Sequence, residues 1–545
     1  METTDFSNKA QRLIDSIKGI CNSAGLGGDA NEYKIVTQGF LYKFLNDKFL
    51  YEINKLDPSL KTYEDLNNLS ENDYQLLMIK LGTKAPHMKP NHLLSYLFSH
   101  QNDNGGVGFA KLFDNTLNDI AVDNSSIFSV HTAGNTEIRL FEEELIGRSI
   151  NDRSQHDATA RAIVNALAES KFDFNEIFNA GFDFFSTLFE YMIKDYNKDG
   201  GGKYAEYYTP HSIAKIMADI LVGDDQPSNV TAYDPAAGSG TLLMNLAHRI
   251  GSDRCTVYSE DISQKSSNLL RLNLILNDLS HSIDHIIQGN TMTDPRHIAQ
   301  KFDYIVSNPP FKVDFSAEHE KITSLANVNQ RFFAGIPKIP NAKKDSMAIY
   351  LLFIQHIMYS LSPSGKSAIV VPTGFITAQS GIEKNIRTKI IENGWLKGVI
   401  SMPSNIFATT GTNVSILFID KSAGSDEVVL MDASKLGKQV KEGKNQKTVL
   451  SRAEQAQIVD VFRSREAVDD LSVVVSNDQI KEKNYSFSAG QYFEVKIEYV
   501  DITANEFASK MSDHQARLDE MFAEGERLND EIKKQLSGLK YEWHN

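Results

Sequence analysis

Two short motifs contain the residues of this chain that could do chemistry. The first, Asp234-Pro-Ala-Ala-Gly-Ser-Gly240, has glycines that let a backbone turn tightly and approach a ligand closely. The second, Asn308-Pro-Pro-Phe311, offers an amide oxygen, a rigid bend and an aromatic face. Together the two motifs predict a loop that holds a cofactor beside a pocket for a planar base.

The elements that must position these motifs are strands of one sheet. Residues 230–233 and 302–306 are predicted as buried strands, and each ends directly before one of the motifs. Open α/β sheets bind their ligands at the carboxyl ends of the strands. Both motifs are therefore expected at that edge.

Five further segments predict strands, and helical patterns lie between most of them. These segments are residues 255–258, 285–287, 367–371, 396–401 and 414–419. No helix is evident between the last two, so we expect them to form an antiparallel pair. The chain is therefore predicted to have an α/β fold with a mostly parallel, seven-stranded sheet.

Polar residues at two other strand ends are candidates for cofactor binding. Glu260 and Asp261 stand at the tip of the strand that follows the glycine-containing loop, where an acid commonly holds ribose hydroxyls. Asn290 follows the end of the next strand. Leu243 occupies the place of the third glycine in a Gly-x-Gly-x-x-Gly motif, which disfavours a nicotinamide enzyme.

The segment Glu206-Tyr-Tyr-Thr-Pro210 precedes a periodic helical pattern. Thr209 could cap that helix, with Pro210 at its first position. The glutamate and the two tyrosines could equally line a cofactor pocket. The two motifs downstream favour this second interpretation.

The chain on either side of the sheet is predicted to be helical. Residues 1–175 are expected to form an α-helical domain, residues 176–475 the catalytic domain, and residues 476–545 a carboxyl-terminal segment. The segment includes a long helix that opens with a capping box of Thr503 and Glu506. Its imperfect heptad stripe could pack on its own domain or on a partner, and we favour a partner.

Two segments could face nucleic acid. Residues 312–345 show little periodicity and contain basic and aromatic side chains. A lysine-bearing stretch covers residues 435–447. Each segment could equally be a solvated surface loop.

Composition limits the class of protein. The 545 residues carry a formal charge of −15, which works against non-specific binding to a polyanion, so a nucleic-acid partner would need local basic patches or a second, basic protein. The two cysteines form no metal-ligand pair, which predicts no structural metal and fits a reducing cytoplasm. The chain shows no signal peptide and no apolar run of roughly 18 residues, so a cytoplasmic protein without a membrane partner is expected.

Several segments, taken in order, resemble a known family. Tyr207-Tyr-Thr-Pro210 and the two motifs of the opening paragraph are similar to motifs X, I and IV of adenine-N6 DNA methyltransferases of the gamma arrangement. The whole chain resembles the modification (M, methylation) subunit of a type I restriction-modification system. Further segments typical of that subunit are Met402-Pro-Ser-Asn-Ile-Phe407 with Thr410-Gly411, and Asn484-Tyr-Ser-Phe-Ser488 with Gln491-Tyr492.

The resemblance implies a Rossmann-like fold that uses S-adenosyl-L-methionine to methylate N6 of adenine in double-stranded DNA. The partners it implies are a DNA-specificity (S) subunit and, in the larger complex, a restriction or motor (R) subunit. The implied cofactor contacts are Glu206, Tyr207, Tyr208, Thr209, Pro210, Asp234, Ala236, Gly238, Ser239, Gly240 and Glu260. Many relatives carry an acid where this chain has Asn290, whose amide oxygen could still accept from the adenine amino group of the cofactor.

The residue types suit the implied reaction, with Asn308, Pro309, Pro310 and Phe311 as the catalytic residues. The lone pair of an adenine amino group is delocalised into the ring and must be localised before it can attack. The Asn308 amide oxygen and the Pro309 carbonyl can accept hydrogen bonds from the two amino hydrogens as the nitrogen becomes tetrahedral. Phe311 could stack on a base that has been flipped out of the duplex.

Two other functions remain open from the sequence. Asn-Pro-Pro-aromatic also occurs in enzymes that methylate the amide nitrogen of protein glutamine, because a planar NH2 group poses the same chemical problem. A catalytically silent assembly subunit is the second alternative, and it would be expected if either motif were degraded. Both motifs are intact.

Overall fold

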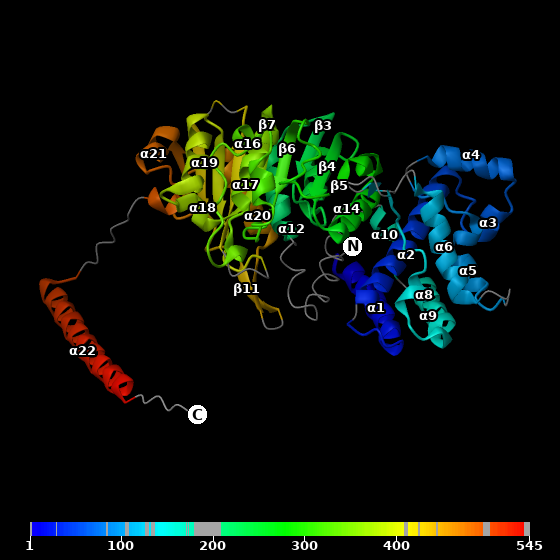
Figure 1. Cartoon of the computed structure of the whole chain (residues 1–545), viewed down its shortest axis with the longest axis horizontal. Coiled ribbons are helices and arrows are strands. Elements are labelled where there is room, and N and C mark those ends of the chain that lie inside the picture. Colours follow the sequence, from blue (N-terminus) through cyan, green and yellow to red (C-terminus); the bar gives the residue numbers. More distant parts are fainter. Residues whose placement is uncertain are drawn as a thin grey trace. The chain divides into compact units, whose positions relative to one another are not determined.

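The computed structural model describes residues 3–28, 30–82, 85–103, 108–125, 130–131, 137–170, 172, 174–178, 209–407, 413–422, 424, 426–442, 445–493 and 502–538. The chain divides into two compact units, Met1–Phe493 and Glu494–Asn545. Each unit is described by itself. Figure 1 shows the described elements in chain order by colour.

A nine-stranded sheet forms the centre of the first unit (Figure 1). Its strands, in spatial order, are β13 (Ser472–Ser476), β10 (Glu427–Asp432), β8 (Leu396–Ser401), β9 (Val414–Asp420), β7 (Leu361–Pro372), β6 (Phe302–Ser307), β3 (Val230–Asp234), β4 (Cys255–Asp261) and β5 (Ile286–Gln288). From β5 to β7 every pair is parallel, whereas β9 runs antiparallel to both of its neighbours. The predicted antiparallel pair, β8 and β9, is confirmed.

The predicted count of seven strands is corrected to nine. All seven predicted strands are present, and β10 and β13 extend the sheet beyond β8. Both lie after the point where the predicted sheet was complete. β13 is also an edge strand whose side chains are only partly buried, so its pattern lacks the continuous apolar run of a central strand.

Helices cover both faces of the sheet, which is why its central strands are apolar on both sides. One face is covered by α12 (His211–Val222), α13 (Thr241–Ile250), α14 (Gln264–Leu276) and α20 (Arg452–Ser464). The other is covered by α17 (Tyr350–Ser360), α18 (Thr373–Thr377), α19 (Gly381–Glu392) and α21 (Asn477–Glu482). On β3 the alternation is direct, since Ala232 belongs to the first core and Tyr233 to the second.

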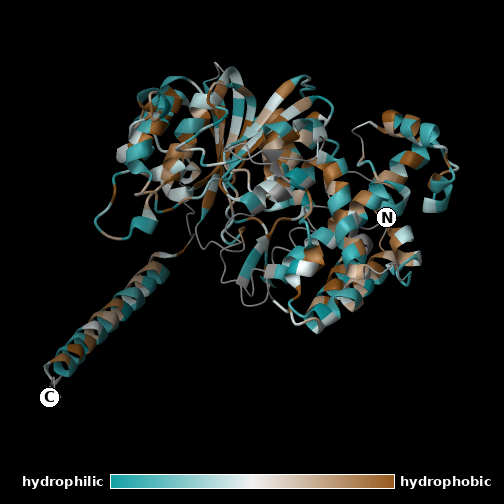
Figure 2. Cartoon of the chain, turned by 45° about the vertical axis from the view of Figure 1, so that its right-hand side comes forward, coloured by the Kyte–Doolittle hydropathy of each residue, from teal (hydrophilic) through white to brown (hydrophobic). Residues whose placement is uncertain are grey.

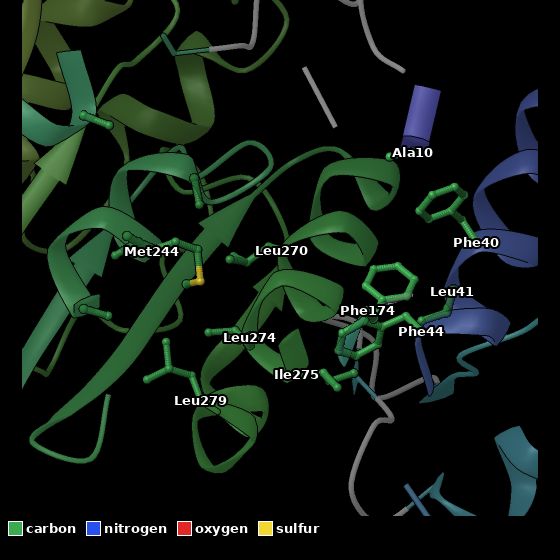
Figure 3. Packing of buried hydrophobic residues seen from close by; sticks show 14 of the residues in the cluster. Ala10, Phe40, Leu41, Phe44, Phe174, Met244, Leu270, Leu274, Ile275 and Leu279 are labelled. Atoms are coloured by element: carbon green, nitrogen blue, oxygen red, sulfur yellow. The ribbon is translucent and has the colours of Figure 1, made fainter. Parts of the chain in front are cut away.

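The amino-terminal region is helical, as predicted. Its elements are α1 (Thr3–Ser23), α2 (Ala30–Leu56), α3 (Tyr63–Asn67), α4 (Glu71–Leu81), α5 (Leu94–Ser99), α6 (Phe109–Asp123), α8 (Leu145–Ser149), α9 (His156–Glu169) and α10 (Asn175–Phe178), with a small pair of strands, β1 (Val130–His131) and β2 (Glu137–Ile138). Figure 3 shows Phe44 of α2 and Phe174 beside Ile275 of α14. Because Lys48 also pairs with Asp278 at 3.0 Å, apolar and ionic contacts hold the helical region against α14 and the residues that follow it.

The segment after Phe311, residues 312–349, is folded rather than extended. It contains α15 (His319–Thr323) and α16 (Val328–Arg331), and its apolar side chains pack with Leu352 and Phe353 of α17 into a third core. We call residues 312–349 the insertion. The lysine-bearing stretch forms a hairpin of β11 (Lys438–Glu442) and β12 (Asn445–Val449).

The second unit contains α22 (Ala504–Ser537), and its predicted capping box is confirmed by reciprocal hydrogen bonds between Thr503 and Glu506. No residue of this helix is buried. Figure 2 shows hydrophobic residues distributed along it among hydrophilic ones. Nowhere in the part of the chain that the structure describes is a helix both long and apolar enough to span a membrane.

Candidate active site

The Asp234 motif forms the turn between β3 and α13. Asp234 is 1 % exposed, and its Oδ1 accepts hydrogen bonds from the Ala236 amide at 2.9 Å and from the Ser307 hydroxyl at 2.8 Å. Ser307 is the last residue of β6 and directly precedes Asn308. One carboxylate oxygen therefore ties the two predicted motifs together at the carboxyl edge of the sheet.

Two glycines of this turn adopt positive φ angles, +54° at Gly238 and +85° at Gly240. These conformations favour glycine, because a Cβ atom would clash with the backbone. A Cβ on Gly240 would in addition lie 2.1 Å from Cδ1 of Leu270 on α14. The Asn273 side chain of α14 donates to the Ser239 carbonyl at 2.7 Å. The turn is therefore held from the α14 side by close packing and by a hydrogen bond.

Asn308 is held by Thr209, which lies 99 residues earlier in the chain. The Asn308 amide nitrogen donates to the Thr209 hydroxyl at 3.1 Å, which leaves the amide oxygen as the group available to accept from a ligand. Thr209 is not the helix cap considered from the sequence. Pro210 occupies the N-cap position of α12 and makes no side-chain cap hydrogen bond.

A recess at the sheet edge brings together residues of all three predicted motifs. Its lining residues are Thr209, Asp234, Ala236, Ala237, Ser239, Thr241, Leu242 and Asn308. The recess offers a carboxylate, hydroxyls and the amino end of the ten-residue helix α13. A carboxylate suits the ammonium group of S-adenosylmethionine, and a helix amino terminus suits its carboxylate, so these residues fit the polar end of that cofactor.

The rest of the Asn-Pro-Pro-Phe motif lies along the path out of β6. Pro309 is buried, whereas Pro310 and Phe311 are partly exposed. The Phe311 ring meets the Tyr350 ring edge-on at a centroid distance of 6.2 Å. Phe311 thus has one packed edge and enough exposure to contact a ligand.

Glu260 does not face the recess. It is 1 % exposed, and its carboxylate accepts from the Tyr233 hydroxyl at 2.8 Å and from the backbone amides of Arg296 and His297. The ribose-binding role predicted for it is therefore not supported, because both carboxylate oxygens are already occupied inside the protein.

Asp261, the second acid at this strand end, lies at the cofactor turn instead. Its Oδ2 accepts from the Gly238 amide at 2.8 Å and its Oδ1 from the Ser263 amide at 2.7 Å. Successive residues of a strand point to opposite faces. Glu260 is therefore buried, whereas the next residue, Asp261, lies at the loop. The sequence places both acids at this strand end, and the pairing of β4 decides which of them lies at the loop.

Asn290 lies in the loop after β5, where its Oδ1 accepts from the Met292 amide at 3.0 Å. The next residue, Thr291, donates its hydroxyl to the Pro235 carbonyl at 2.7 Å. The β5 loop is thereby attached to the Asp234 turn. Glu206, Tyr207 and Tyr208 lie outside the described residues, as do Thr410 and Gly411.

Burial controls the electrostatics of the site. Loss of solvation raises the pKa of Asp234 to about 7, although the hydrogen bonds from Ala236 and Ser307 oppose the shift. Burial also raises the pKa of Asp261, against the hydrogen bonds from Ser263 and Gly238. Two partly desolvated acids beside one loop favour a cationic ligand. Among the described residues, no cluster of histidine, cysteine and acidic side chains could hold a metal ion.

The fold defines a class of protein, the α/β methyltransferases. The chain belongs to the N-6 DNA Methylase family, which matches residues 180–500. This membership confirms the family resemblance inferred from the three motifs.

Two relatives and a solved structure match most of the chain. The type I restriction enzyme MpnII methylase subunit of Mycoplasma pneumoniae is 26% identical over 98% of this chain and 96% of that protein. The HindI methylase subunit of Haemophilus influenzae is 25% identical over 80% of this chain and 94% of that protein. A crystal structure of the type I restriction-modification system methyltransferase subunit from Streptococcus thermophilus covers 91% of this chain and 100% of that chain, with a TM-score of 0.69 and 22% identity. The predicted methyltransferase fold class is confirmed.

Proposed function

We propose that this chain is the methylation subunit of a type I restriction-modification system and transfers a methyl group from S-adenosyl-L-methionine to N6 of adenine in double-stranded DNA. The observation that carries the proposal is the Asn308 amide, oriented by Thr209 at 3.1 Å beside the recess of the Asp234 turn. Family membership and the similarity to methylase subunits along the whole chain support the same activity.

The cofactor would lie in the recess, where it would supply an electrophilic methyl group. Asp234 would pair with its ammonium group, and the turn at Gly238 and Ser239 would approach it through the backbone. Asp261 takes the ribose role in this proposal, because its side chain is partly exposed at the turn, whereas Glu260 is only 1 % exposed. Asn290 would lie near the adenine end of the cofactor.

The target adenine would meet Asn308, Pro309 and Phe311. The amide oxygen and the Pro309 carbonyl would accept the two amino hydrogens, which localises the nitrogen lone pair for attack on the methyl carbon. As the new bond forms, the carbon–sulfur bond breaks and its electron pair stays on sulfur. An amide cannot take up a proton. The methylated nitrogen would therefore lose its extra proton to water. Phe311 would stack on the flipped base.

Sequence choice would come from a separate specificity subunit. After β9 the chain adds β10, β13, the β11–β12 hairpin and short helices to the same unit, and then the exposed helix α22. A separate base-reading module would need on the order of 100 residues of its own. α22 is the proposed docking element, because its apolar side chains are exposed. A restriction or motor subunit would join the larger complex.

The test is a methyl-acceptor assay with labelled cofactor, on the chain reconstituted with its specificity subunit. Adenine-containing duplex DNA should be labelled at N6, and total cellular protein should not. If protein glutamine were labelled and DNA were not, the chain would be a glutamine methyltransferase and the proposal would be wrong. An absence of labelling despite cofactor binding would favour the silent assembly subunit.

A further inference from the structure

Four buried polar side chains form a continuous hydrogen-bonded chain beneath the recess. They are Arg331, His356, Tyr233 and Glu260, exposed by 0, 1, 0 and 1 %. Arg331 Nε donates to His356 Nδ1 at 2.9 Å. His356 Nε2 lies 3.1 Å from the Tyr233 hydroxyl, which donates to Glu260 Oε2 at 2.8 Å. A buried cation is thus joined to a buried acid through two neutral groups.

The two end residues of this hydrogen-bonded path determine which group donates each hydrogen bond. Arginine can only donate, so His356 accepts at Nδ1 and carries its proton on Nε2. That Nε2–H can then donate to the Tyr233 oxygen, whose own proton goes to Glu260. Burial and the nearby Arg331 cation lower the pKa of His356 well below its ordinary value, which keeps the imidazole neutral. Every donor along this hydrogen-bonded path therefore has one acceptor. The direction of donation, from Arg331 toward Glu260, cannot be reversed.

The hydrogen-bonded path starts in the insertion, at Arg331. Arg331 closes α16, and besides His356 it donates to the backbone carbonyls of Met292 at 3.0 Å and Thr291 at 2.6 Å. Thr291 is the residue whose hydroxyl bonds to Pro235 of the cofactor turn. A single guanidinium therefore attaches the insertion to the loop after β5 and, through it, to the recess.

The other end lies under the second acid of the site. Glu260 immediately precedes Asp261, whose carboxylate accepts from Gly238. Tyr233 immediately precedes Asp234 on β3. The hydrogen-bonded path thus joins the strand ends that carry Asp234 of the recess and Asp261 of the adjoining turn. It joins both to the insertion, which follows Phe311.

A purely structural role can be compared within the same molecule. Arg387 is also 0 % exposed, and its guanidinium likewise donates to three groups, the backbone carbonyls of Tyr485, Phe375 and Ala378. Its bonds end on carbonyls, with no side-chain path to the recess. Removing either arginine should destabilise the fold, because its buried acceptors lose their donors. Only Arg331 leads to the cofactor site.

We propose that Arg331 is a positioning residue that couples the docking of the insertion to binding at the cofactor recess, through His356, Tyr233 and Glu260. The inference rests on the proposed function, since it names a determinant of the same site. Coupling between two binding or ordering events is reciprocal. Cofactor binding should therefore stabilise the insertion, and a docked insertion should raise cofactor affinity by the same factor.

The experiment uses the full chain and compares Arg331→Met with Arg387→Met as the matched control. Calorimetry gives the affinity for S-adenosylmethionine. Trypsin cleavage at the exposed lysines of the insertion reports its docking with and without cofactor; these are Lys312, Lys321, Lys338, Lys343 and Lys344. We expect Arg331→Met to bind cofactor about tenfold more weakly and to lose cofactor-dependent protection from trypsin. Arg387→Met should keep both properties at a comparable loss of melting temperature.

Tyr233→Phe decides the matter if Arg331→Met does not fold. Phenylalanine keeps the stacking of this ring on Phe302, at a centroid distance of 4.3 Å, and removes only the hydroxyl at the middle of the chain. It should show a smaller change in the same direction. Wild-type cofactor affinity together with wild-type protection in the folded variants overturns the inference. Failure of the wild-type chain to bind S-adenosylmethionine would instead overturn the proposed function.

Discussion

At the scale of single residues, Asn308 is the group whose removal should separate chemistry from cofactor binding. In Asn308→Ala the recess keeps Asp234 and the glycine turn, so affinity for S-adenosylmethionine should stay nearly unchanged. Methyl transfer by the assembled enzyme should fall by a factor of about 100 or more, because a preorganised acceptor typically contributes ~3 kcal/mol to the transition state. Calorimetry and single-turnover methylation measure the two effects. Lost affinity with unchanged turnover would show that Asn308 belongs to cofactor binding.

Gly238 should have the opposite profile. Its φ of +54° is strained for a β-branched residue, and its amide donates to Asp261 at 2.8 Å. Gly238→Val should therefore distort the turn and abolish cofactor binding, with loss of all methylation. Gly424→Val serves as a control, since a Cβ at Gly424 meets nothing within 4 Å. Normal affinity in Gly238→Val would move the cofactor site elsewhere.

Asp234 predicts a pH dependence of stability in the cofactor-free protein. Its folded pKa of about 7 lies above the ordinary 3.8, so the ionised form destabilises the fold. The cost is complete above pH 7 and disappears as the pH falls toward 4. Asp234→Asn should thus raise the free energy of unfolding more at pH 8 than at pH 5, with a difference on the order of a few kcal/mol. If Asp234→Asn changed the free energy of unfolding equally at both pH values, ionisation of Asp234 would not destabilise the fold.

At the scale of elements, α22 carries a row of exposed apolar side chains and no buried residue. Met521 is 65% exposed and Leu528 44%. Changing both to Glu should leave the melting temperature of the isolated chain unchanged, because neither packs on it. The same change should abolish co-purification with the specificity subunit. Lys533→Ala is the polar control on the same helix. Retained co-purification of the double variant would place the docking surface outside α22.

At the scale of the whole molecule, a net charge of −15 gives little general attraction for DNA phosphates. We therefore expect the isolated chain to bind cofactor but to methylate plasmid DNA poorly and without one preferred sequence. Addition of the specificity subunit should raise the rate and confine methylation to one site. Sequencing that maps methylated adenines measures both. Robust methylation of a single sequence by the chain alone would contradict this division of labour.

The sequence by itself determined the parts of the molecule that depend on local pattern. Seven strands, the helices between them and the capping box at Thr503 follow from periodicity and from residues a few positions apart. The placement of the two motifs at the ends of β3 and β6 was likewise predictable, because the carboxyl ends of parallel strands lie at the same edge of a sheet. The predicted three-domain boundaries stay a prediction.

Only the tertiary structure decided which side chains meet. The hydrogen bond of Asn308 to Thr209 spans 99 residues, and no local pattern encodes it. The choice between Glu260 and Asp261 depends on the face that each presents, which β4 acquires only by pairing with β3, where Asp234 lies opposite Ser259. The buried path from Arg331 to the recess arises because the insertion folds back over α17. Long-range packing determines such contacts, whereas composition and spacing report only what lies nearby along the chain.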